Sequence, residues 1–99
     1  MADLASEVNL LKNLFSDFVN KQGIESVIVE SVSAAIEDGS YESLNEVECY
    51  WLKEALNQTQ KKTAFQGEIE QVIEAIWLAK KDNFTIPAFV KRILSQLYP

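Results

Sequence analysis

Residues 38–51 read DGSYESLNEVECYW and carry the signals for the end of one helix and the start of the next. Gly39 can adopt the left-handed backbone conformation that closes a helix at its C-terminal end. Ser43, followed three residues later by Glu46, forms a capping box, in which two side chains bond free backbone amides at a helix start. The stretch therefore predicts a short turn between two helices, and a strand or an extended loop here would contradict that prediction.

Apolar residues on both sides of this turn recur with the spacing of helices that bury one face. In the first segment the stripe follows alternating steps of four and three residues: Leu4, Val8, Leu11, Phe15 and Phe18. Thr63 and Gln66 form a second capping box. The expected helices run from about residue 3 to 20, from 24 or 25 to 38, from a cap at Ser43 into residues 57–62, from a cap at Thr63 to 83, and from a cap at Thr85 almost to residue 99.

Single residues mark further ends of these helices. Asp3 can cap the first helix, and Gly23 and Asn83 suit the left-handed position after the first and the fourth. Before the fifth helix, Phe84 can pack onto Phe89 as a hydrophobic staple. We therefore expect each helix to begin or end on local sequence signals.

These elements predict an all-α single domain over residues 1–99, a bundle of four to five amphipathic helices in antiparallel or orthogonal packing. A chain of 99 residues supports one core but not two. Residues 25–33 are rich in β-branched side chains, so a strand paired across a dimer is the alternative there. The predicted core comprises Leu11, Phe15, Phe18, Ile28, Val32, Trp51, Leu52, Ile69, Val72, Ile76, Phe89, Ile93 and Leu97.

The net charge of −6 is concentrated in the middle of the chain, where residues 25–54 hold eight acids and one base. Such a surface repels phosphate backbones, so we do not expect a nucleic-acid partner. The longest apolar run, at residues 75–79, is too short to cross a membrane, and we expect no signal peptide. A single cysteine fits the reducing cytosol, so we expect a cytoplasmic protein.

The chemistry of the side chains argues against catalysis, and we expect no enzyme, no metal site and no cofactor. The chain has no histidine and one cysteine, which removes His-based acid–base chemistry and thiolate zinc sites. Cys49 lies about 120° from the centre of its apolar face, beside carboxylates that make a thiol a poorer nucleophile. The carboxylate pairs Glu42/Glu46 and Glu70/Glu74 are expected to lie on solvated faces.

Apolar side chains at helix edges predict a contact surface. Leu78 lies almost opposite the apolar stripe of its helix, while Tyr50 and Trp77 lie at stripe edges. The fifth helix has a wide apolar face, which predicts a homodimer formed through it. The candidate interface comprises Tyr50, Trp77, Leu78, Leu94, Leu97 and Tyr98.

Residues 38–56 resemble the joint between the two helices of ribbon-helix-helix antitoxins of the ParD type. The matching residues are Gly39, Tyr41, Ser43, Glu46, Val47, Ala55 and Leu56. The resemblance implies a DNA-binding strand upstream of the first of these helices. Where the resemblance implies that strand, residues 11–23 read instead LKNLFSDFVNKQG, a sequence typical of a helix.

Two functions follow from these observations. The first is a non-catalytic protein-interaction domain of a regulatory or adaptor type, whose partner meets the acidic middle or the apolar helix edges. The alternative is a transcriptional regulator or antitoxin-like DNA-binding protein, as the ParD-like joint implies. That alternative would depend on the basic residues Lys80, Lys81, Lys91 and Arg92.

Overall fold

The computed structural model describes residues 3–99, and within them the chain forms five α-helices and one 3₁₀ turn but no strand. This confirms the all-α prediction, and it shows that residues 26–33, for which a dimer-paired strand was the alternative, belong to a helix. The elements are α1 (Leu4–Gln22), α2 (Ser26–Asp38), the 3₁₀ turn η1 (Tyr41–Ser43), α3 (Glu46–Asn57), α4 (Ala64–Asp82) and α5 (Ala88–Leu97).

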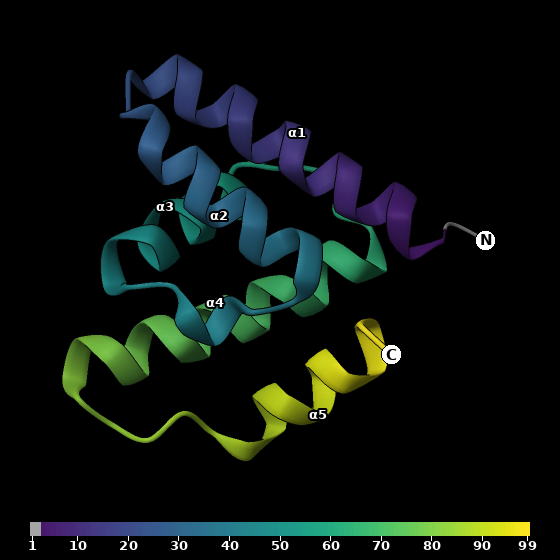
Figure 1. The fold of residues 1–99 in the computed structure, drawn as a ribbon, viewed down its shortest axis with the longest axis vertical. Helices are drawn as coiled ribbons and strands as arrows, with labels where there is room; N and C mark the ends of the chain where they lie inside the picture. The colour runs from purple at the N-terminus through teal and green to yellow at the C-terminus, as the bar shows by residue number, and fades with distance from the viewer. Residues whose placement is uncertain (1–2) are drawn as a thin grey trace.

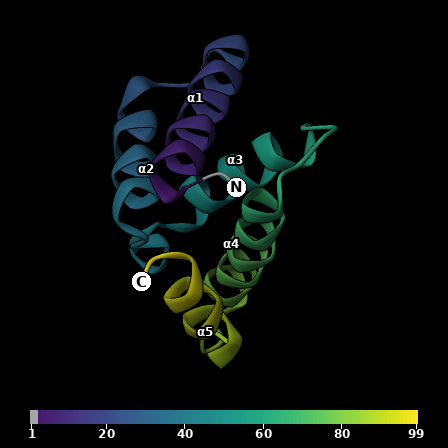
Figure 2. The same cartoon turned by 90° about the vertical axis from the view of Figure 1, so that its right-hand side faces the viewer.

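The helices form one globule around α4. Figure 1 shows α1 and α2 side by side as an antiparallel pair, and α3 packs against both of them and against α4. Both views place the start of α5 on the side of α4 that is remote from α1 (Figure 2), and among the helices α5 packs mainly on α4. The connection from α4 to α5 therefore lies at the periphery of the fold.

The core follows the predicted stripes closely, because eight of the expected core residues are buried: Leu11, Phe15, Phe18, Val32, Leu52, Ile69, Val72 and Ile76. The other expected core residues are half-buried against it: Ile28, Trp51, Phe89, Ile93 and Leu97. Cys49, about 120° from the centre of the apolar face, is nevertheless fully buried. Because α3 packs against three helices, its buried arc is wider than a single stripe.

The start of α3 differs from the expected capping box at Ser43 and Glu46. Ser43 ends η1 instead, and its hydroxyl donates to the Ser40 carbonyl at 2.7 Å. The cap of α3 is Asn45, which forms the capping box with Glu48. The physical reason is backbone conformation: an N-cap needs extended dihedral angles, which Asn45 has (φ −81°, ψ 176°).

The joint between α2 and α3 is nevertheless the short turn that the sequence predicts. Gly39 has φ 81° and closes α2 in the left-handed conformation. The Lys80 ammonium, from α4, donates to the carbonyl oxygen of Glu42 at 2.6 Å and to that of Leu44. The Lys80 ammonium thus provides hydrogen-bond donors for two backbone carbonyls of the turn between α2 and α3.

Two tyrosines attach the end of α5 to α2 and η1. The Tyr98 hydroxyl donates to the Ile36 carbonyl at 2.8 Å, and it lies 2.6 Å from the Tyr41 hydroxyl. Because a carbonyl only accepts, Tyr98 uses its hydrogen on Ile36, and Tyr41 donates to Tyr98. Burial raises the pKa of Tyr98 to about 12 and that of the fully buried Tyr41 well above its ordinary value.

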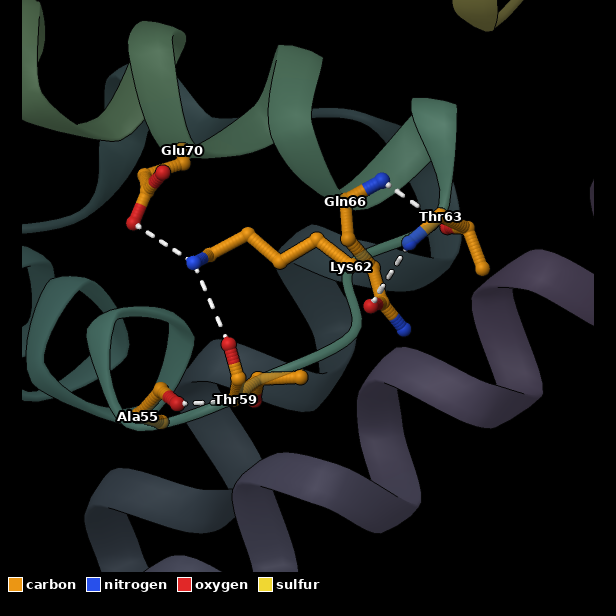
Figure 3. Close-up of polar contacts among 6 residues, drawn as sticks. All are labelled: Ala55, Thr59, Lys62, Thr63, Gln66 and Glu70. Carbon is orange, nitrogen blue, oxygen red and sulfur yellow. Dashed lines mark hydrogen bonds and ion pairs between the residues drawn. The ribbon is translucent and has the colours of Figure 1, made fainter.

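The turn from α3 to α4 is closed by polar side chains (Figure 3). The Lys62 ammonium lies 3.2 Å from the Thr59 carbonyl, to which it donates, and 3.7 Å from the Glu70 carboxylate. Thr63 and Gln66 form the second capping box, as expected. These polar groups of the α3–α4 connection are therefore hydrogen-bonded or ion-paired within the connection and the start of α4.

The start of α5 differs from the sequence prediction. Thr85 does not cap the helix, because Pro87 occupies the N-cap position and no side chain bonds the first-turn amides. Phe84 lies too far before this cap to act as a staple, and its side chain is 70% exposed. We expected a side-chain cap at the start of α5, and the structure has none there.

Candidate functional site

The C-terminal end of α4 is closed by a Schellman motif, in which the chain turns back through a left-handed residue. Asn83 is that residue, with φ 59°, as the sequence predicts. The amide of Phe84 then donates to the carbonyl of Ala79 at 2.7 Å. This bond fixes the direction in which the chain leaves α4, and with it the position of Phe84.

Phe84 lies at the site where a Schellman motif usually makes an apolar contact with the last turn of its helix. The residue on that turn is Ala79, whose side chain is a single methyl group. A methyl group covers little of a phenyl ring, and Phe84 stays 70% exposed. It is the most exposed large apolar side chain of residues 3–99.

An apolar groove runs along α4 beside this ring and is called the α4–α5 groove below. It has a volume of about 490 Å³. Leu78 lines it and is 41% exposed, in keeping with its predicted position opposite the stripe of α4. The groove is lined by Gln71, Glu74, Ala75, Leu78, Ala79, Phe84, Thr85, Pro87 and Phe89.

Charged side chains border this apolar surface without being neutralised by the chain itself. Glu74 and Lys81 are both exposed, and neither forms an ion pair within residues 3–99. The Lys81 ammonium lies 4.8 Å from the centre of the Trp77 ring, a cation–π contact. The groove lining therefore has one free acid, Glu74, while Lys81 is held against Trp77 outside the lining.

Two of the other predicted interface residues meet in an aromatic cluster between α3 and α4. The ring centres of Tyr50 and Trp77 lie 6.3 Å apart, and Trp51 lies 5.1 Å from Tyr50. The Lys53 ammonium lies 4.9 Å from the centre of the Trp77 ring. Trp77 thus has a lysine from α3 and one from its own helix against it, and most of its surface is used within the chain.

The predicted interface residues of α5 lie on its inward side. Leu94 is 8% exposed and belongs to the core. Tyr98 is half-buried, with its ring against Gly39 and its hydroxyl on Tyr41. Leu97 is half-buried and lines a second groove of about 580 Å³ beside the start of α1. These side chains leave a partner little apolar surface on α5.

Cys49 is not a reactive thiol in this fold. Its side chain is fully buried, and burial raises the pKa of the thiol to about 11 from 9.0, although the nearby Lys80 charge opposes the rise. The sequence points to neighbouring carboxylates as the cause, but their contribution is smaller than that of burial.

No group of three Cys, Asp or Glu side chains in residues 3–99 is placed to hold a metal ion. Within the same residues, no helix is both long enough and apolar enough to cross a bilayer. Of the basic residues considered for DNA, Lys80 is engaged by backbone carbonyls and Lys81 by Trp77. The remaining two, Lys91 and Arg92, are exposed on α5.

Comparison of the chain with protein-family models, with curated proteins and with solved structures finds no match. The ParD-like resemblance is confined to the joint, since the residues ahead of it form α1 and α2 and not a strand.

The sequence prediction missed Phe84 as a surface residue because a staple to Phe89 gave it a place inside the fold. A signal for its exposure was present in the sequence. With Asn83 as the left-handed residue, the apolar partner of Phe84 in a Schellman motif is Ala79. An alanine there predicts an uncovered ring.

Proposed function

We propose that the protein is a non-catalytic protein-interaction domain of a regulatory or adaptor type, and that it binds its partner through the α4–α5 groove. The observation that carries this proposal is the position of Phe84 and Leu78, two large apolar side chains that are 70% and 41% exposed beside one groove. Exposed apolar side chains gathered at a groove are typical of protein contact sites.

The chemistry of the remaining side chains supports a binding role over a catalytic one. The chain has no histidine, and its one thiol is buried with a raised pKa. The groove offers a single carboxylate, Glu74, and no second acid–base group opposite it. A lone cysteine also favours the cytoplasm as the place of action.

The test is affinity capture from a native lysate at low and at high ionic strength, with three forms of the protein. The wild-type chain is compared with Phe84→Asp and with Val47→Asp, a control on α3 whose side chain is 53% exposed away from the groove. We expect the wild type and the control to retain the same proteins, an untagged copy of the chain included. The Phe84→Asp variant should lose them.

Either of two results would contradict the proposal. The first is that all three forms retain the same proteins, which would place binding outside the groove. The second is that the wild type retains no protein at either ionic strength.

A further inference from the structure

The outer face of α4 carries charges in a pattern that is complementary to itself. At about 100° per residue, Glu74 and Lys81 fall on one flank of Leu78, some 40–60° from it. They precede and follow Leu78 by four and three residues. Ala75 and Asp82 fall on the other flank at similar angles. The exposed leucine therefore has an acid before it and a base after it on the same side.

A second copy of this helix matches that pattern when it runs antiparallel. A two-fold axis through the contact between the two Leu78 side chains places residues before Leu78 opposite residues after it, on the same flank. Glu74 of each copy then faces Lys81 of the other, and two ion pairs form. A parallel two-fold arrangement would instead bring this flank against the opposite flank of the other copy, so that Glu74 would face Ala75 and lack a cation to pair with.

The same operation gives the exposed Phe84 ring a contact across the axis that its own chain does not provide. Phe84 follows Leu78 by six residues, so its counterpart across the axis lies about as far before Leu78. The groove residue nearest that level is Gln71, seven residues before Leu78. It is followed by Glu74 and Ala75, at four and three residues before Leu78. Phe84 of one copy therefore lies against the Gln71 end of the other copy's groove, and the contact repeats by symmetry.

We propose that the partner of the α4–α5 groove is a second copy of this chain, in an antiparallel α4–α4 dimer centred on Leu78 with Glu74 paired to Lys81 across the axis. The proposal rests on the proposed function and names its partner. The sequence predicts the dimer contact on α5, but the proposed contact lies on α4. The reason is that Leu94 belongs to the core and Tyr98 donates to a backbone carbonyl of α2 within the chain.

The experiment is light scattering during size-exclusion chromatography of the full chain at tens to hundreds of micromolar. A monomer has a mass of 11.2 kDa, and we expect the wild type at twice that mass. Leu78→Asp should run as a monomer, while the control Val47→Asp should stay a dimer. Circular dichroism and thermal melts of each variant verify that the helices are intact, since all of these side chains are exposed.

A charge swap separates this geometry from other dimers. Glu74→Lys and Lys81→Glu alone should each weaken the dimer at least tenfold, because each places like charges across the axis. The double variant carrying both changes should recover most of the wild-type dimer constant. A merely destabilising effect of Lys81→Glu, such as loss of its contact with Trp77, would not be reversed by the second change.

Three results would overturn the proposal: a wild-type mass of 11.2 kDa at every concentration, a dimer that survives Leu78→Asp, or a double variant no better than the single ones. A monomeric wild type that still captures a lysate protein in a Phe84-dependent way would overturn the dimer and leave the proposed function standing. A wild type that is monomeric and also captures no lysate protein would contradict both the dimer and the proposed function.

Discussion

The ends of α1 and α4 share a left-handed residue and the backbone hydrogen bond that follows it, and they use them differently. Each helix closes through a left-handed residue, Gly23 or Asn83, and the next amide bonds back to the carbonyl five residues earlier. After α1 that next residue is Ile24, which is half-buried and bonds back to buried Val19. After α4 it is Phe84, which bonds back to Ala79 and stays exposed.

The difference shows that a helix end can serve stability or recognition with one backbone geometry. A large buried residue on the last turn draws the following side chain into the core. A small one leaves that side chain outside, in a position that the backbone hydrogen bond still fixes. An exposed ring on a fixed backbone loses less conformational freedom on binding than one on a flexible loop.

The largest loss of stability should come from Gly39→Ala. Gly39 is a further left-handed residue at a helix end, where an added side chain would also clash with a neighbouring ring. An alanine Cβ at Gly39 would lie 2.8 Å from the ring of Tyr98, in a backbone of φ 81°. We expect a loss of about 3 kcal/mol in the free energy of unfolding, from left-handed strain and overpacking together. Urea unfolding measures it.

The matched control for that change is Gly23→Ala, where a Cβ would meet no atom within 4 Å. Strain alone then predicts a loss of about 1–2 kcal/mol. Equal losses at the two glycines would show that the Tyr98 ring does not constrain the end of α2.

The comparison itself is tested by truncating one apolar residue at each end. Val19→Ala removes two fully buried methyl groups and leaves a cavity, so it should cost about 2 kcal/mol. Phe84→Ala removes a larger side chain that is mostly in solvent, and in dilute protein it should cost less than about 0.5 kcal/mol. Chemical unfolding of both variants gives the two values, and a similar cost for both would contradict the assignment of Phe84 to recognition.

A smaller effect should come from exchanging the left-handed residue of α4 for the one that α1 uses. Asn83→Gly removes the strain of a side chain at φ 59°, and we expect a gain of about 0.5 kcal/mol. The dimer constant should be unchanged, because Phe84 keeps its position. A loss of stability in thermal unfolding would mean that the Asn83 side chain makes a contact of its own.

The smallest effect on stability at neutral pH should come from ionisation of the Cys49 thiol. This thiol is fully buried, in contrast to the exposed Phe84 at the end of α4. Its folded pKa of about 11 exceeds the ordinary 9.0, so the folded state holds the proton more tightly and stability falls as pH rises from about 9 to 11. Raised tyrosine pKa values add to the loss above pH 10. Cys49→Ala should flatten the first part of this decline.

Thiol labelling compares the two regions directly in Phe84→Cys, which then carries one buried and one exposed thiol. The raised pKa lowers the thiolate fraction of Cys49 about 100-fold at pH 8, and burial slows its reaction further. A disulfide reagent should therefore give a fast phase from position 84 and a slow phase from Cys49. A single fast phase that accounts for both thiols would show that the start of α3 opens readily and exposes Cys49.

Much of this fold follows from the sequence, because its helix stripes and most of its caps are local signals. The stripes that contain Leu11, Val32 and Ile69 became the core as expected. The cap at Ser43 was wrong because a 3₁₀ turn competes with it, and Asn45 offers an equally good cap two residues later. Local patterns do not decide between two adjacent caps, since the packing of Leu44 into the core selects one.

The candidate site was predicted only in part. Leu78 could be placed on the surface from its angle on α4, but the burial of Leu94 within its own chain could not, because the apolar face of α5 is about 140° wide at about 100° per residue and could cover either the core or a second copy. Which side of such a helix is buried depends on long-range contacts. For α5 these include the hydrogen bond from Tyr98 to the Ile36 carbonyl, 62 residues away in sequence.

Amide hydrogen exchange of the wild type and of Leu78→Asp, at one high protein concentration, tests most directly whether the end of α4 meets a partner while the end of α1 does not. We expect the amides of residues 84–86, 88 and 89 to exchange more slowly in the wild type than in the variant, because the dimer covers them. The amides of residues 23–26, at the end of α1, should exchange equally in both proteins. Equal exchange at residues 84–89 in the two proteins would contradict a recognition role for this helix end.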